Sequence, residues 1–356
     1  MATTISNDDV LKALGTVLDP DLRKDLVTLN MIKNVTVTDG NNVSFTVELT
    51  TPACPLKNKI KADAQQAVAA IEGVGEINIE MSAKVRADGI SREIHLPIRN
   101  IVAVASGKGG VGKSTISANL AVALAQSGAK VGLMDADIYG PNIPTMMGVK
   151  EPPRSDGDRI IPPESYGIKI ISIGFFVQPD QPLIWRGPML HNAIRQFVSD
   201  VEWGNLDYLI IDLPPGTGDI QLSLTQILPL SGGIIVTLPQ KVSLEDALRG
   251  LKMFDKLNIP ILGVVENMSY LEMPDGTRMD VFGGGGGKAL AAETNSLFLG
   301  EIPMDPQVRI GGDNGMPIVI SDPNKPAAIA LRSIAERLAA QLSINAHANA
   351  EAVVES

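Results

Sequence analysis

The chain has 356 residues, of which 44% are hydrophobic and 20% charged, and this composition excludes wholesale disorder and predicts a globular protein with room for two domains. A formal net charge of −10 argues against a general nucleic-acid-binding protein, because such a protein needs a basic face to displace counterions from phosphates. No nucleic-acid partner is expected on that ground. The single cysteine, the polar N-terminal stretch and the lack of a long apolar run predict a cytoplasmic protein with no membrane partner.

Residues 1–84 have the pattern of a small α+β domain. Apolar residues at helical spacing predict a helix from Asn7 to Leu18, which stops before Asp19-Pro20. Two alternating runs, 32–38 and 43–49, flank an Asp-Gly-Asn-Asn stretch and predict a hairpin. A helix over 56–71 and a short strand over 77–79 complete this unit, and a polar linker over 85–99 follows it.

Residues 100–343 alternate strand-like apolar runs with helical patterns. Because the runs are apolar on both faces, they predict an α/β fold with a mostly parallel sheet covered by helices on both faces. The capping-box spacing of Ser243 and Asp246 predicts the start of a helix that ends near Leu257. A last helix is expected over 327–342, followed by a flexible tail over 344–356. The predicted strands are 101–106, 130–136, 168–175, 206–212, 233–238, 259–265 and 297–302.

The segment after the first of these strands matches the phosphate-loop pattern G-x-x-x-x-G-K-S/T and is followed directly by a helical run. Its glycines let backbone N–H groups close around phosphate oxygens, and the helix dipole adds to the attraction for anions. Lys113 offers charge to the β- and γ-phosphates, and Ser114 offers a hydroxyl to Mg²⁺. The pattern predicts a P-loop NTPase fold whose nucleotide contacts are Gly107, Lys108, Gly109, Gly110, Val111, Gly112, Lys113, Ser114 and Thr115.

Carboxylates follow two other predicted strands. Asp135 and Asp137 end one of them, and Asp212 ends another, so all three are expected at the carboxyl edge of the sheet, where ligands of open α/β sheets bind. Asp212 is the candidate for holding the hydration shell of Mg²⁺. A capping or turn role explains Asp135 and Asp219 equally well, and the sequence leaves that choice open.

The second lysine of the loop, Lys108, gives the form KGGVGKST, which resembles the MinD/ParA/nitrogenase-iron-protein group of dimeric P-loop ATPases. That resemblance implies a homodimer in which Lys108 reaches the nucleotide of the partner subunit. It also implies that Asp137 positions or activates the attacking water and that the N–H of Gly216 senses the γ-phosphate. An additional phosphate contact within one subunit remains an alternative role for Lys108.

Four segments together, SGKGGVGKST, DADIYGPNIP, DLPPGTGD and ENMSY, resemble the Mrp/ApbC family of iron–sulfur cluster carrier ATPases over residues 98–340. The resemblance implies hydrolysis of ATP to ADP and phosphate, and partners among iron–sulfur assembly proteins and recipient apoproteins. It places Asn267, Pro303 and Asp305 around adenine. The segments LDPDLRKDLVTLNMI and TTPACPLK make the N-terminal unit similar to a small domain found in iron–sulfur assembly factors.

One departure from the family pattern concerns the cluster itself. Family members typically carry C-x-x-C shortly after ENMSY, so that a dimer supplies four thiolates to a 4Fe–4S cluster. Here Met273 and Gly276 occupy those positions, and neither can replace a thiolate. Cys54, which precedes Pro55 and a predicted helix, is the remaining candidate ligand for an iron–sulfur cluster, and a small buried apolar side chain at a turn is the equally open alternative.

Two further functions stay open at this level. A positioning ATPase of the MinD/ParA kind would need a basic lipid-seeking helix or a DNA-binding face, and the acidic balance argues against both. An assembly or regulatory ATPase that has lost cluster binding is compatible with the missing C-x-x-C.

Overall fold

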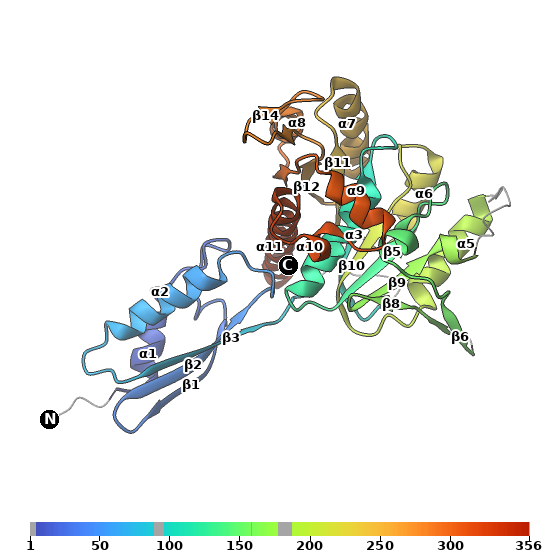
Figure 1. Ribbon diagram of the computed structural model, residues 1–356. Helices are drawn as coiled ribbons and strands as arrows, with labels where there is room; N and C mark the ends of the chain where they lie inside the picture. The colour runs from blue at the N-terminus through green and yellow to red at the C-terminus, as the bar shows by residue number, and fades with distance from the viewer. Residues whose placement is uncertain (1–4, 89–95, 158, 177–186, 356) are drawn as a thin grey trace. The chain divides into compact units, whose positions relative to one another are not determined.

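The computed structural model describes residues 5–88, 96–157, 159–176 and 187–355, and the chain divides into two compact units. One consists of residues 1–89 with 339–356, and the other of residues 90–338 (Figure 1). Part of the predicted linker, residues 89–95, lies outside the described residues. The predicted domain boundaries remain predictions.

The N-terminal unit is an α+β structure with a three-stranded sheet in the order β1-β2-β3. The predicted hairpin pairs β1 with β2 in antiparallel orientation, and β3 adds to β2 in parallel. The first helix ends at Leu14 rather than Leu18, because Gly15 lies at its C-cap. The elements are α1 (Asn7–Leu14), β1 (Ile32–Thr38), β2 (Asn42–Leu49), α2 (Lys57–Ala69) and β3 (Ile77–Ala83).

The second unit is built on an eight-stranded sheet in the order β15-β12-β11-β4-β10-β5-β9-β8, parallel except for β8. Its main strands are β4 (Ile98–Ser106), β5 (Val131–Asp135), β8 (Glu164–Ser165), β9 (Ile168–Ser172), β10 (Leu206–Asp212), β11 (Gly232–Thr237), β12 (Ile261–Glu266) and β15 (Phe298–Glu301). Two small hairpins lie outside it, β6 (Arg154–Asp156) with β7 (Arg159–Ile161) and β13 (Leu271–Glu272) with β14 (Arg278–Met279).

The helices of this unit are α3 (Lys113–Gln126), α4 (Ile143–Met146), α5 (Gly187–Ser199), α6 (Asp219–Ile227), α7 (Lys241–Lys256), α8 (Gly286–Glu293), α9 (Pro306–Asp313) and α10 (Ile318–Ser321), with the 3₁₀ turn η1 (Ile173–Phe176). The last helix, α11 (Pro326–Glu355), begins in this unit, and its residues from 339 onward belong to the first unit.

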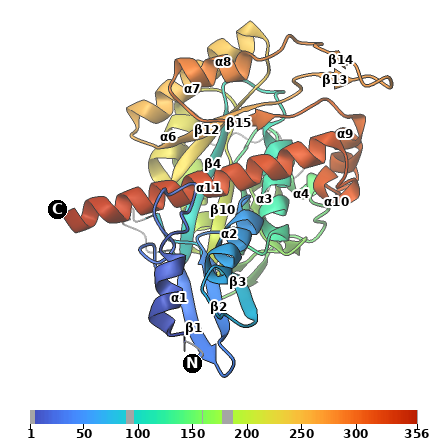
Figure 2. The ribbon, with the colours of Figure 1, turned by 90° about the vertical axis from the view of Figure 1, so that its left-hand side faces the viewer.

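Both faces of the large sheet are buried, as the apolar runs predict. Along β4, Ile101, Ala103 and Ala105 pack in one hydrophobic cluster with residues of α5, α6, α7 and α8. Val102 and Val104, which alternate with them, are also fully buried but lie on the opposite face. Figure 2 shows α3 and the first part of α11 on that side of the sheet. The prediction of a mostly parallel sheet between two helical layers is confirmed.

In the second unit the structure also corrects the predicted ends of β9, α7 and α11. Strand β9 stops at Ser172 because the chain then turns into η1. Helix α7 begins at Lys241, before Ser243, because the Ser243 hydroxyl accepts the N–H of Leu238 at the end of β11 instead of capping the helix. Helix α11 continues to Glu355, so residues 344–355, predicted as a flexible tail, are helical. The segment after Leu342 contains no proline or glycine and is rich in alanine, which favours continuation of a helix.

Candidate functional site

The phosphate loop connects β4 to α3, and its backbone depends on glycine. Gly110 and Gly112 have φ of 80° and 86°, the left-handed region that disfavours other residues, and Gly112 is the N-cap of α3. A Cβ on Gly112 would lie 2.3 Å from the Asn267 side-chain nitrogen. At Gly107, a Cβ would lie 2.1 Å from the carbonyl carbon of Asp246 in α7. The loop is therefore tightly enclosed by neighbouring elements.

At the start of α3, Lys113 is 5% exposed and its Nζ lies 2.8 Å from Asp212 Oδ2 and 3.4 Å from Asp137 Oδ2. The Ser114 hydroxyl donates to the same Asp212 oxygen at 2.6 Å. Asp212 pairs in register with Val104 of β4 and Asp135 of β5, which places all these groups at the carboxyl edge of the sheet. The structure thus brings together four of the residues predicted for phosphate and Mg²⁺.

The other carboxylates of this edge have perturbed acidity. Burial, followed by the nearby Asp212, raises the pKa of the Asp135 carboxyl to about 8. Its oxygens accept bonds from the N–H groups of Asp137 and Ile143 and from the Ser172 hydroxyl. Burial also raises the pKa of Asp137, although the Lys113 ammonium opposes this. Three hydrogen bonds therefore tie the buried Asp135 carboxyl to the segment that follows β5 and to the end of β9, as expected if this residue has a capping or turn role.

The donors present fit a hard cation such as Mg²⁺. Ser114 Oγ and Asp212 Oδ2 are oxygens, and one carboxylate with one hydroxyl leaves room for water and phosphate oxygens around a six-coordinate ion. Within residues 5–88, 96–157, 159–176 and 187–355, no group of three or more His, Cys, Asp and Glu could hold a metal by itself. The arrangement suits a cation that arrives with phosphates.

The loop after β10 lies against the phosphate loop. The N–H of Gly216, the predicted γ-phosphate sensor, donates to the Ser106 carbonyl at 2.9 Å, and the φ of Gly216 is 94°. Ser106 in turn donates through its hydroxyl to the Lys108 carbonyl at 3.0 Å. In this conformation the Gly216 N–H is engaged by protein, so contact with a phosphate requires rearrangement of the loop.

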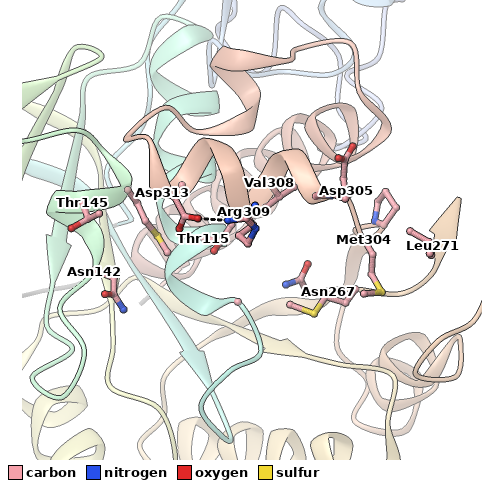
Figure 3. A pocket seen from close by; sticks show the side chains of 16 residues that line it. Thr115, Asn142, Thr145, Asn267, Leu271, Met304, Asp305, Val308, Arg309 and Asp313 are labelled. Atoms are coloured by element: carbon pink, nitrogen blue, oxygen red, sulfur yellow. Dashed lines mark hydrogen bonds and ion pairs between the residues drawn. The ribbon is translucent and has the colours of Figure 1, made fainter.

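Two adjoining cavities extend from this edge. One, of about 360 Å³, is lined by the phosphate loop, Asp137 and Tyr139. The other, of about 620 Å³, is lined by seven apolar and seven polar or charged side chains with two glycines, and includes the three predicted adenine residues, Asn267, Pro303 and Asp305 (Figure 3). The cavities share the lining residues Gly112, Thr115, Asn142 and Met146. The smaller cavity therefore offers a place for a triphosphate tail, and the adjoining larger cavity offers one for a planar base.

Several residues of the site carry no sequence signal that identifies their role. Ser117 bonds to Asp212, and no motif marks it. Asn142 and Thr145 line the large cavity, as does the ion pair of Arg309 and Asp313 in α9, with 2.5 Å between Nη1 and Oδ2 (Figure 3). The segment DADIYGPNIP contained Asn142, but nothing in it indicated which side chains face a base.

The positions of the missing C-x-x-C form a turn between β13 and β14. The N–H of Met273 donates to Thr277 O, and Gly276 closes the turn with φ of 80°. Arg278 lies over the Tyr270 ring, with its guanidinium carbon 4.0 Å from the ring centre. Cys54, in the N-terminal unit, is half-buried and packs against the hydrophobic core of that unit, three residues before α2 begins at Lys57. No set of thiolates for a cluster is present in one chain.

Comparison with known proteins agrees with this geometry. Residues 97–339 match the family model of the NUBPL iron-transfer P-loop NTPases, and residues 7–79 match that of an iron–sulfur cluster assembly protein. The chain belongs to the NUBPL-type iron-transfer P-loop NTPases. An iron–sulfur cluster carrier protein of Synechocystis is 50% identical over 351 residues, which cover 96% of this chain and 99% of that protein. The resemblance predicted from the four motifs is confirmed.

Solved structures with a similar fold include nucleotide-binding proteins. A nucleotide-binding protein of Archaeoglobus fulgidus in complex with ADP is 38% identical, with a TM-score of 0.57, and the match covers 65% of this chain and 90% of that one. The cell division ATPase MinD of Pyrococcus furiosus is 25% identical, with a TM-score of 0.54, over 67% of this chain and 97% of that one. In the part of the chain that the structure describes, no helix is both long and apolar enough to cross a bilayer.

Proposed function

We propose that this NUBPL-type NTPase is an Mg·ATP-hydrolysing carrier of iron–sulfur clusters. The observation that supports this most strongly is the pair of adjoining cavities at the phosphate loop, which share four lining residues, in a chain 50% identical over nearly its whole length to a protein named iron–sulfur cluster carrier. Family membership supports NTP chemistry in general, and the choice of ATP, Mg²⁺ and cluster is part of the proposal.

The choice of adenine rests on the orientation of Asn267. Its side-chain nitrogen donates to the Val111 carbonyl at 2.8 Å, which fixes the amide and turns its oxygen toward the open space of the cavity (Figure 3). An oxygen acceptor there matches the exocyclic amino group of adenine and repels the carbonyl oxygen of guanine. Asn267 is 8% exposed, so leaving its side-chain oxygen without a hydrogen-bond donor would be costly. This cost would make the site select adenine over guanine effectively.

In the proposed reaction, water attacks the γ-phosphorus, the bond to the bridging oxygen breaks, and ADP and phosphate leave. Lys113 and the N–H groups of the loop hold the phosphates, and Asp137 orients the water and accepts its proton. The pKa of Asp137, raised by burial, suits a proton acceptor better than that of an exposed carboxyl. Ser114 and Asp212 would hold Mg²⁺, which when bound neutralises phosphate charge.

The cluster is cargo, and the donors of one chain do not fit it. A 4Fe–4S cluster prefers four thiolates, while this chain has one cysteine and a dimer has two. We therefore propose no ligand set within the chain alone. Cys54 with non-cysteine ligands, an external thiol or cysteines of a partner protein would complete the coordination.

The test is anaerobic reconstitution of the full chain with ferrous iron and sulfide, followed by counting of bound iron and sulfide and by transfer to an apo-enzyme that requires a 4Fe–4S cluster. We expect bound cluster in the wild type and faster transfer with Mg·ATP than with Mg·ADP. A matched set consists of wild type, Cys54→Ala and Ser127→Ala, the last of which leaves the thiol in place. Loss of iron in Cys54→Ala alone would identify the ligand.

Absence of bound iron in every variant, together with normal ATP hydrolysis, would overturn the carrier function and favour an assembly or regulatory ATPase. The turn that occupies the C-x-x-C positions is the observation on which this second candidate rests. ATP-dependent co-sedimentation with anionic vesicles or with DNA would instead favour a MinD/ParA-like positioning ATPase.

A further inference from the structure

Ser117 is a buried hydroxyl next to the phosphate site that has no role in the P-loop pattern. It lies in α3 one helical turn after Lys113 and is fully buried. Its Oγ donates to Asp212 Oδ1 at 2.7 Å and lies 3.1 Å from the Lys113 carbonyl. A hydroxyl has one proton, and the shorter distance to a carboxylate places it on Asp212.

With this bond, both oxygens of Asp212 are engaged. Ser114 and Lys113 take Oδ2, at 2.6 and 2.8 Å, and Ser117 alone among these three takes Oδ1. The terminal torsion of an aspartate has broad, roughly two-fold preferences, so covalent geometry does not fix which oxygen faces the phosphate loop. The Ser117 bond fixes it, because it holds Oδ1 while Ser114 and Lys113 hold Oδ2.

We propose that Ser117 is a positioning residue that orients Asp212 toward the Mg²⁺ that accompanies the nucleotide. The inference rests on the proposed Mg·ATP function and adds to it a residue outside the phosphate-loop pattern. Groups that orient a metal-holding carboxylate typically contribute a factor of about 10–100 to metal affinity or activity. The effect should therefore appear in the dependence on Mg²⁺ and not in binding of the nucleotide alone.

A purely structural role makes a different prediction. Serines in helices often bond to the carbonyl one turn earlier, and the Lys113 carbonyl is available for this. If that were the whole role of Ser117, its removal would lower the free energy of unfolding without changing the response to Mg²⁺. Ser127 provides the matched control, because it lies at the other end of α3 and its hydroxyl donates to Leu124 O at 2.6 Å.

The experiment measures ADP affinity by calorimetry on the full chain, first in EDTA and then over a series of Mg²⁺ concentrations. For Ser117→Ala we expect the Mg²⁺ concentration that gives half of the maximal affinity gain to rise about 10-fold, with affinity in EDTA within about two-fold of wild type. Ser127→Ala should match wild type. Ser117→Thr, which keeps a hydroxyl, should restore most of the Mg²⁺ response, and circular dichroism confirms that each variant is folded.

The proposal is overturned if Ser117→Ala and wild type share one Mg²⁺ dependence, or if Ser127→Ala shifts it equally. It is also overturned if folded Ser117→Thr behaves like Ser117→Ala, because the hydroxyl would then not be responsible. Failure of the proposed function gives a separate result: the wild type itself would bind ADP without any gain from Mg²⁺.

Discussion

Close approach of backbone explains the glycine at position 107 better than any contact with phosphate does. A Cβ there would lie 2.1 Å from the carbonyl carbon and 2.6 Å from the next backbone nitrogen in α7, and backbone atoms cannot rotate away. We predict that Gly107→Ala lowers the free energy of unfolding by about 1–3 kcal/mol, as overpacking of a core does. Chemical denaturation with urea measures this directly.

Gly109→Ala is the control in the same loop, because its Cβ would have no neighbour closer than 3.9 Å. We expect its free energy of unfolding to stay within about 0.5 kcal/mol of wild type. Equal destabilisation of the two variants would show that the requirement for glycine at position 107 comes from the conformation of the loop and not from the close approach of α7.

The raised pKa of the Asp135 carboxyl leads to a specific prediction for how stability depends on pH. Its carboxyl has a pKa of about 8 in the folded chain against an ordinary 3.8, so the folded state keeps a proton that the unfolded chain releases between these values. The free energy of unfolding should therefore fall as pH rises through that window, by at most about 1.4 kcal/mol per pH unit from this group. Urea denaturation between pH 5 and about 8 should give a flatter profile for Asp135→Asn. Parallel profiles for the two proteins would contradict this assignment.

At the same scale, the sequence predicted which residues meet at the phosphate site but not how they bond. The phosphate-loop pattern predicted that Lys113 and Ser114 lie side by side at the phosphate site. The strand ends predicted that Asp137 and Asp212 lie close to them at the carboxyl edge of the sheet. Ser117 could not be found this way, because its bond depends on how closely α3 passes the end of β10. That distance is set by packing on both elements.

Among the elements, α7 shows how a local signal is overridden by tertiary contacts. Ser243 has the spacing of a capping residue, yet it is 2% exposed inside the helix, and its hydroxyl accepts from Leu238 N at 3.1 Å and lies 3.0 Å from Thr237 Oγ1. We predict that Ser243→Ala lowers the free energy of unfolding by about 1–3 kcal/mol, because the Leu238 N–H would be left buried without a partner. Thermal and urea unfolding would both report the loss.

Ser199→Ala, at an exposed position in α5, is the control and should change stability by less than about 0.5 kcal/mol. A similar small effect at Ser243 would mean that water or another group replaces its hydroxyl.

Seven of the eight strands of the large sheet were predictable because period and apolarity differ strongly between helices and buried strands, whereas the two-residue strand β8 and the two small hairpins were not predicted. The ends of the elements were less predictable. Strand β10 begins and ends where its apolar run does, whereas α11 extends to Glu355 because nothing in the alanine-rich segment stops it. The turn between β13 and β14 was not predicted, because the segment drew attention only for the cysteines that it lacks at Met273 and Gly276.

For the whole molecule, a homodimer of the kind that the MinD/ParA-like phosphate loop implies would give Lys108 its role at the partner's nucleotide. The residue lines the phosphate cavity but is half-exposed, unlike the buried Lys113. We predict that Lys108→Ala binds ATP with an affinity within a few-fold of wild type but forms no ATP-dependent dimer and loses at least about 10²-fold in hydrolysis, the scale expected for loss of one stabilising charge. Light scattering coupled to size exclusion, with and without ATP, measures the dimer.

The control is Lys130→Ala, which removes an exposed lysine directly before β5. This variant should form the ATP-dependent dimer and hydrolyse ATP as wild type does. If Lys108→Ala formed the ATP-dependent dimer normally, the role of Lys108 across the dimer would be contradicted. A phosphate contact within one subunit would then be its remaining role.

The whole account depends on a nucleotide held by its phosphates at the start of α3. Calorimetric titration of ATP in excess Mg²⁺ into wild type and Lys113→Ala, with circular dichroism to confirm folding, tests this most directly. We predict one site per chain in the wild type and at least about a 100-fold loss of affinity in the variant, since two charge-assisted contacts to phosphate are worth about 3 kcal/mol or more. Equal affinity in the two proteins, or no heat of binding in the wild type, would contradict the account.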